Sequence, residues 1–247
     1  MQALATPLAE RLHPGRTVLA VEEGRHAVRV RAWNEARSAA EQWEAERVVL
    51  ALPLQAAVRV VSGLDAPRQR ALRETAAATR HAPWLVANLQ LDAWPLARSG
   101  AVLAWDNVAF QPAGRSPMLG YVDARHQSLR PDVMAAPPVI SVYLALPEAR
   151  REHLLTGTAA QWTAEVLAHL APMHPDLAQR LRQADLTRWG HAMAIPAPGV
   201  AGQRARHALR EPVARVAFAH SDLAGYSVFE EAFTLGMRAG RALARRR

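Results

Sequence analysis

The stretch EPVARVAFAHSDLAGYSVFEEAFTLGMRAGRALARRR, residues 211–247, decides the fold. Residues 213–219, apolar apart from Arg215, predict a short buried strand. A polar turn follows, and from about Phe229 the pattern predicts a helix that reaches the end of the sequence. Glu230 and Glu231 lie in the first turn of this helix and arginines in its last, an arrangement that suits the helix dipole at both ends. A strand, an acidic turn and a helix N-terminus in this order are typical of nucleotide sites.

Upstream segments predict further strands. Residues 17–23 (TVLAVEE) and 26–33 (HAVRVRAW) flank a Gly-Arg turn, and the alternating apolar positions of the second segment fit a β-hairpin. Residues 48–53 (VVLALP) are apolar on both faces, so they predict a strand buried in the middle of a sheet.

The middle of the chain predicts a different architecture. Residues 67–80 predict a helix, and strands are expected at 83–94 and 139–146. Residues 158–170 predict a second helix, with apolar residues at helical spacing. The strand signals here are mostly antiparallel. The sequence therefore predicts a mixed α/β (α+β) protein, in which an antiparallel sheet with helices is inserted into a second, discontinuous domain.

Composition closes several classes of function. The chain has 247 residues and no cysteine, and all 30 basic residues are arginine. A cysteine nucleophile, a zinc–cysteine cluster, a Walker phosphate loop and a lysine Schiff base are therefore excluded. His169 and His174 are separated by a helix-breaking proline, so we expect no metal site. No apolar run reaches the roughly 18 residues of a membrane helix, and we expect a cytoplasmic protein without membrane contact.

The formal net charge of +8 raises nucleic acid as an alternative partner. The arginines, however, are scattered singly along the chain and are not gathered into one run. We therefore expect no nucleic-acid partner. An arginine-rich nucleic-acid binder would instead show an affinity that falls steeply as salt is raised.

Four segments in order resemble the C-terminal portion of the flavin-containing amine oxidase and protoporphyrinogen oxidase superfamily. FAHSD at 218–222 and FEEA at 229–232 with Gly236 are similar to the end of that family's last flavin strand and the start of its last helix. VVLALP resembles its VIxAxP strand, and TVLAV at 17–21 resembles its strand beside the adenine. RW at 188–189 is similar to its tryptophan segment. The matches span nearly the whole chain.

The resemblance implies a partial Rossmann-like FAD-binding domain with an inserted substrate domain. The FAD-binding domain is expected from residues 1–62 and 205–247, and the substrate domain, with its antiparallel sheet and helices, from residues 63–204. The implied reaction is hydride transfer from a C–H bond of a small-molecule substrate to N5 of the flavin, followed by reoxidation by oxygen or another acceptor.

The resemblance also implies roles for single residues. His191 is the candidate catalytic residue, because a neutral imidazole over the flavin can orient substrate or move a proton near pH 7. A helix N-terminus stabilises negative charge that develops at the N1/O2 edge of a flavin. The implied cofactor contacts are Val18 with the adenine, Ser221 and Asp222 with the ribityl or pyrophosphate part, and the N–H groups of Val228, Phe229 and Glu230 with the pyrimidine edge; Trp189 and Tyr226 would face the substrate.

The chain departs from the family in two respects. The family's FAD site begins with a G-x-G-x-x-G turn, whereas no two of the 13 glycines here are separated by a single residue. We therefore expect a chain that lacks this N-terminal segment: a split-gene subunit, a decayed remnant, or the product of a start codon placed too far downstream. The absence of lysine also removes the lysine-held water of several amine oxidases. We expect a related C–H oxidation or desaturation rather than amine oxidation.

Two alternatives stay open at this point. Asp222 can simply cap a turn, and the last helix can simply pack against a sheet, without any ligand. The chain can also be a non-catalytic fragment or partner subunit. It would then associate with another chain through the surface that the missing segment leaves bare.

Overall fold

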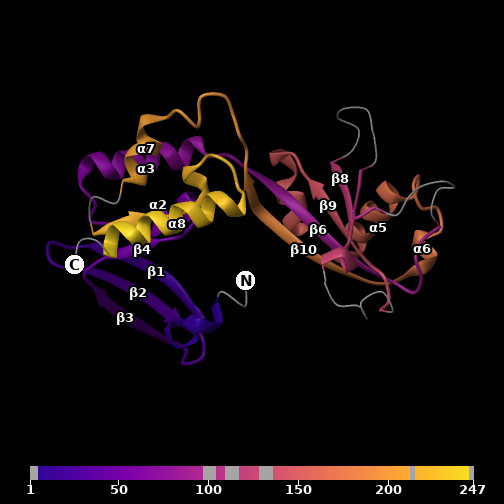
Figure 1. Cartoon of the computed structure of the whole chain (residues 1–247), viewed down its shortest axis with the longest axis horizontal. Helices are drawn as coiled ribbons and strands as arrows, with labels where there is room; N and C mark the ends of the chain where they lie inside the picture. Colours follow the sequence, from indigo (N-terminus) through magenta and orange to yellow (C-terminus); the bar gives the residue numbers. More distant parts are fainter. Residues whose placement is uncertain (1–4, 97–103, 109–116, 128–135, 212–214, 245–247) are drawn as a thin grey trace. The chain divides into compact units, whose positions relative to one another are not determined.

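The computed structural model describes residues 5–96, 104–108, 117–127, 136–211 and 215–244. The chain folds into two compact units (Figure 1). Unit 1 consists of Met1–Arg80 and Ala194–Arg247, and unit 2 consists of His81–Met193. Each unit has its own hydrophobic core. None of the helices in the described ranges is long and apolar enough to cross a bilayer.

A four-stranded mixed sheet forms the first part of unit 1, in which β1, β2 and β3 pair antiparallel and β5 pairs parallel with β1. Its strands are β1 (Arg16–Glu23), β2 (Val28–Asn34), β3 (Ala39–Ala45) and the short β5 (Val61–Ser62), in the order β3-β2-β1-β5. The predicted hairpin is confirmed as β1 and β2. Their register shifts between Val18 and Ala20, a local irregularity of the kind that bends a strand. β3 is a polar segment without clear alternation, and its pairing with β2 makes it a strand.

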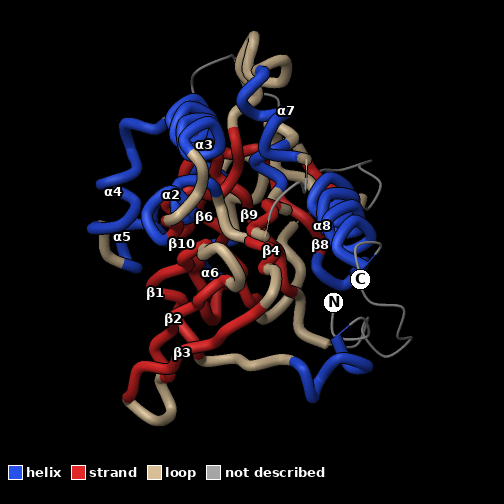
Figure 2. Tube along the Cα trace, turned by 90° about the vertical axis from the view of Figure 1, so that its left-hand side faces the viewer, coloured by secondary structure: helices blue, strands red, loops and turns tan. Residues whose placement is uncertain are grey.

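Six helices, two of them short 3₁₀ turns, are described in unit 1. They are η1 (Thr6–Arg11), α2 (Leu54–Val60), α3 (Ala66–Ala78), α7 (Arg204–Arg210), η5 (Ser221–Leu223) and α8 (Phe229–Ala244). α3 begins after Asp65, whose side chain caps the first turn. α8 buries Leu235 and Ala239 and confirms the predicted last helix as far as Ala244; residues 245–247 fall outside the described residues. In both views the β1–β3 sheet lies on one side of α2 and α8, with α3 and α7 on the other (Figure 2).

Unit 1 also contains a parallel pair of strands. β4 (Val48–Leu50) pairs with β11 (Val216–Phe218), which lies within the strand predicted at 213–219; residues 213 and 214 fall outside the described residues. The sequence predicts β4 as a central strand buried on both faces, and this is wrong for the described part of the chain. There β4 has β11 as its one neighbour, and Val49 is 38% exposed. Only the Leu50 face packs into the core of unit 1.

Unit 2 is a five-stranded antiparallel sheet packed against helices, as the sequence predicts. Alternate side chains of β6 are fully or nearly fully buried, and they pack against Trp162, Val166 and Leu170, which recur at helical spacing on α5. The strand order is β10-β6-β9-β8-β7. The elements are β6 (His81–Leu91), β7 (Asp106–Asn107), β8 (Met118–Asp123), η2 (Ala124–Gln127), β9 (Val139–Ala145), η4 (Glu148–Arg150), α4 (Arg151–Thr156), α5 (Ala159–Leu170), α6 (Leu177–Arg180) and β10 (Leu181–Ala194).

Candidate functional site

The turn between β11 and α8 gathers buried polar groups of unit 1. Ser221 and Asp222 lie three and four residues after the end of β11 and are buried, Asp222 completely. Gly225 closes the turn with a φ of +90°, a backbone conformation that favours glycine. Its N–H donates to the carbonyl of Asp222 over 3.1 Å. The turn is therefore held by its own backbone before α8 begins.

The carboxylate of Asp222 binds groups inside the protein. Its Oδ2 accepts the N–H of Leu54, the first residue of α2, over 2.9 Å. Its Oδ1 lies 3.4 Å from Nδ1 of His220. The first N–H groups of a helix lack partners within it, so Asp222 caps α2 although it lies 168 residues away in sequence. This side chain ties together the segments that follow β4 and β11.

Arg206, on α7, is a fully buried cation beside this turn. Its guanidinium donates to the carbonyl of Val200 (3.1 Å), to the hydroxyl of Thr79 (2.9 Å) and to the carbonyl of Asp222. Burial and the Arg210 guanidinium lower the pKa of Arg206 from its ordinary value, and the Asp222 carboxylate opposes them. Arginine nevertheless keeps its proton in proteins. A buried cation therefore lies at the turn that carries the buried carboxylate, and it binds the backbone carbonyl of the same residue.

The start of α8 is open to solvent. Tyr226, Val228 and Phe229 are 42%, 39% and 56% exposed. The first N–H groups of α8 have no acceptor within the helix, and the positive end of its dipole lies there. The hydroxyl of Tyr226 donates to Oε1 of Glu231 over 2.9 Å. This hydrogen bond and the negative charge of the carboxylate raise the pKa of Tyr226.

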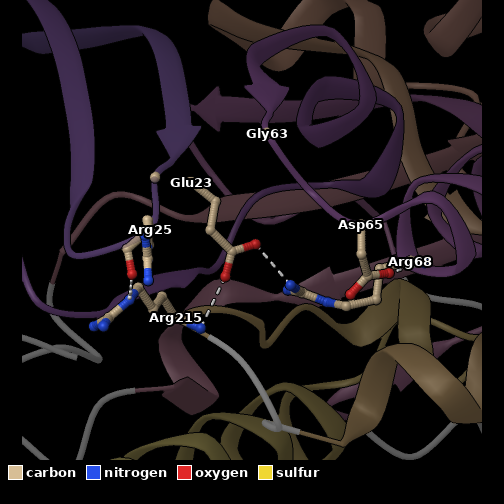
Figure 3. A pocket seen from close by; sticks show the side chains of 7 residues that line it. Glu23, Arg25, Gly63, Asp65, Arg68 and Arg215 are labelled. Carbon is tan, nitrogen blue, oxygen red and sulfur yellow. Dashed lines mark hydrogen bonds and ion pairs between the residues drawn. The ribbon is translucent and has the colours of Figure 1, made fainter.

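A separate cavity of about 360 Å³ lies at the other end of β11 (Figure 3). Glu23 of β1 stands in it. One of its oxygens lies 2.6 Å from Arg68, and the other accepts the N–H groups of Arg215 and Val216 over 2.9 and 3.2 Å. These contacts fix the start of β11 against β1. None of the residues predicted to bind cofactor or substrate lines this cavity.

The predicted site residues fall into two groups. Trp189 and His191 lie on β10 in unit 2, where both are exposed. The ring of His191 packs edge-on against that of His81, with 6.0 Å between centroids. Val18 lies on β1 beside the register shift. The group in unit 1 is Val18, Ser221, Asp222, Tyr226, Val228, Phe229 and Glu230; the roles of both groups stay predictions.

Sequence reasoning missed several residues that build the turn. Arg206 and Arg210 are four residues apart, so their side chains lie on the same face of α7. Both guanidinium groups donate to carbonyls of the turn. That spacing was the available signal. Leu54 acts through its backbone N–H, and nothing in its side chain indicates this role. Thr79 accepts from Arg206 across a long sequence separation that no local pattern reveals.

The residues present fit one part of an FAD molecule. The open start of α8 offers N–H donors beside the exposed side chains of Tyr226, Val228 and Phe229, which suits a flat ring that gains negative charge. The residues present fit the pyrophosphate less well, because the chain has no G-x-G-x-x-G turn and the Asp222 carboxylate already caps α2. The described residues hold no group of three or more His, Asp or Glu side chains that could bind a metal ion.

Two solved structures resemble the chain over almost its whole length. Cyclohexylamine oxidase from Brevibacterium oxydans IH-35A matches with a TM-score of 0.67 and 16% identity, covering 99% of this chain and 51% of the oxidase. A triple mutant of putrescine oxidase, redesigned in its cofactor binding, matches with a TM-score of 0.72 and 20% identity, covering 99% and 53%. The chain thus spans about half the length of these oxidases. The fold is the mixed α/β, Rossmann-like fold of FAD-dependent amine oxidases.

The sequence comparison identifies the family. The family model of flavin-containing amine oxidoreductases matches residues 1–244, and the chain belongs to this family. No curated protein sequence gives a significant match. The resemblance inferred from the four ordered segments is therefore confirmed, and so is the mixed α/β fold class.

Proposed function

We propose that the chain supplies the flavin-ring side of an FAD-dependent oxidoreductase that removes a hydride from a C–H bond of a small-molecule substrate. The observation that carries the proposal is the open start of α8, where exposed side chains surround N–H groups that have no acceptor within the helix, in a fold of this family. When bound, the flavin supplies N5 as hydride acceptor.

In this proposal the residues of unit 1 bind and orient the cofactor. The N–H groups of Val228, Phe229 and Glu230 stabilise negative charge at the pyrimidine edge of the ring. The backbone of Val18 contacts the adenine. Ser221 and Asp222 set the turn beside the ribityl or pyrophosphate part. The support is their common location in one compact unit, on β1, on the turn before α8 and in the first turn of α8.

The residues of unit 2 act on the substrate. The exposed indole of Trp189 offers an apolar surface, and Tyr226 of unit 1 offers a phenol. His191 orients the substrate or moves a proton, as a neutral imidazole can do near pH 7. With no lysine in the chain, the proposal favours a C–H oxidation or desaturation without a lysine-held water. The proposal also assigns residues 1–62 and 205–247 to a domain that binds FAD, and residues 63–204 to a domain that binds the substrate.

Flavin binding tests this function. The purified chain, alone and extended by any in-frame coding sequence upstream of Met1, is mixed with FAD and freed of excess ligand, and its visible absorption is recorded. We expect bound flavin at one molecule per chain. The absence of bound flavin from both forms would contradict the proposal.

A matched pair of variants locates the flavin on the chain. Phe229→Pro removes the side chain and the N–H at the first position of α8, where proline is tolerated. Phe229→Ala removes the side chain alone. We expect flavin affinity to fall up to about tenfold further in the proline variant, the value of one hydrogen bond. Equal affinities would place the ring elsewhere.

A second candidate function is a partner subunit without activity of its own. Phe229, Phe233 and Met237 recur every four residues on one face of α8 and are 56%, 51% and 38% exposed. The rings of Phe229 and Phe233 stack at 5.8 Å. An apolar face of this kind favours association with another chain. Sedimentation over a range of concentrations tests it, and a monomer at every concentration counts against it.

A further inference from the structure

We propose that Arg206 is a positioning residue that holds the turn between β11 and α8 in the geometry needed to receive the flavin ring. This inference rests on the proposed function, because it concerns the same turn. Arg206 is completely buried, so it acts through the backbone of the turn and makes no contact with ligand.

The guanidinium joins three segments of unit 1. Its acceptors are the hydroxyl of Thr79 just after α3, the carbonyl of Val200 in the loop before α7, and the carbonyl of Asp222 in the turn. The hydroxyl of Thr79 is itself fixed, because it donates to the carbonyl of Thr75 over 2.7 Å. Guanidinium donors have a rigid planar arrangement. The three segments therefore keep one relative position as long as Arg206 is present.

The contact with Asp222 falls at the point that controls the turn. The carbonyl of Asp222 accepts from Arg206 and from the N–H of Gly225, which uses both of its lone pairs. Gly225 has a φ of +90°, and α8 begins four residues later. A shift of this carbonyl would move Gly225 and, with it, the start of α8.

Charge gives Arg206 a second effect on the same region. The Asp222 carboxylate is completely buried, and it caps α2 through Leu54. A buried carboxylate is strongly disfavoured without a nearby cation, and the Asp222 carboxylate acts electrostatically on the Arg206 guanidinium. The cation and the carboxylate therefore attract each other beside the turn. Arg210 holds the same turn from α7 through the carbonyl of Leu223.

Hydrogen exchange on the chain without flavin tests the positioning directly. The variants are Arg206→Met, Arg206→Lys, which keeps the charge but loses the planar fork, and Arg204→Met, which alters an exposed arginine of the same helix. We expect Arg206→Met to speed exchange by about tenfold or more in peptides covering 219–229 and 54–57, since a hydrogen bond to a charged group is lost. Arg206→Lys should lie between wild type and Arg206→Met, and Arg204→Met should equal wild type.

Two outcomes of the exchange experiment overturn the proposal. One is unchanged exchange in both peptides for Arg206→Met and Arg206→Lys. The other is an even rise across all of unit 1, which indicates a general loss of stability without a local role. If Arg206→Met fails to fold, the comparison of Arg206→Lys with Arg204→Met decides between the same outcomes.

Flavin binding supplies the readout that a purely structural role would not move. At a temperature where the variants are equally folded, we expect Arg206→Lys to weaken FAD binding by about tenfold to a hundredfold and to shift the visible bands of the bound flavin. Arg204→Met should do neither. Equal affinity and an unchanged spectrum in Arg206→Lys would overturn this inference. A wild-type chain that binds no flavin in either form contradicts the proposed function, and the exchange data then decide the positioning role on their own.

Discussion

Asp222 caps α2 from complete burial, and its loss should cost more than that of an ordinary helix cap. Asp222→Ala leaves the Leu54 N–H without an acceptor and removes the carboxylate near Arg206. We expect the free energy of unfolding to fall by about 3–5 kcal/mol. Asp65→Ala, at the exposed start of α3, should cost only about 1 kcal/mol. Urea denaturation compares them, and equal losses would contradict the buried role of Asp222.

Tyr226 titrates at higher pH than a free phenol, because its hydroxyl donates to Glu231. Glu231→Gln removes the negative charge, so we expect the pKa of Tyr226 to fall toward its ordinary value. The raised pKa means that this contact stabilises the fold below the ordinary pKa and is lost as pH rises through the folded-state pKa. Tyrosinate absorption, corrected with Tyr226→Phe, measures the shift. An unchanged pKa of Tyr226 in Glu231→Gln would contradict the role of Glu231 in raising it.

At the residue scale the sequence indicated where the candidate site lies but not how it is built. The order of FAHSD at 218–222 and FEEA at 229–232 along the chain predicts the strand end and the helix start. The burial of Asp222 and its bond to Leu54 were beyond sequence reasoning, because they depend on a contact across 168 residues. The same holds for Arg206, whose three acceptors come from three separate segments.

Helix α8 presents a buried face and an open one, and paired substitutions distinguish them. Leu235 is buried, whereas Phe233 is 51% exposed. We expect Leu235→Ala to lower the free energy of unfolding by about 2–5 kcal/mol. Phe233→Ser should change it by no more than about 0.5 kcal/mol, as for most surface positions. Thermal and urea unfolding measure both. A large loss in Phe233→Ser would mean that this face is covered.

At the element scale, local periodicity predicted the β1–β2 hairpin, α5 and α8, because their apolar positions repeat at the spacing of a strand or a helix. β3 escaped prediction, because its polar sequence becomes a strand only by pairing with β2. A central strand is expected at 48–53, since the whole run VVLALP is apolar, but β4 covers only Val48–Leu50. Composition does not say on which side a strand finds a partner, and here the Val49 face stays exposed.

At the scale of the whole molecule, the predicted site residues are divided between two compact units, each with its own hydrophobic core. The chain spans about half the length of the oxidases that it resembles. The family is shown by the family model that matches residues 1–244, and the composition, with no lysine and scattered arginines, did not reveal it.

The midpoint potential of the bound flavin tests most directly whether α8 serves a redox site. A reductive titration under anaerobic conditions is compared with free FAD and with Phe229→Pro. Because the helix N-terminus stabilises the negative charge of the reduced ring, we predict a potential above that of free FAD. The potential should fall in Phe229→Pro but not in Phe229→Ala. A bound flavin with a potential equal to or below that of free FAD would contradict the redox role of α8.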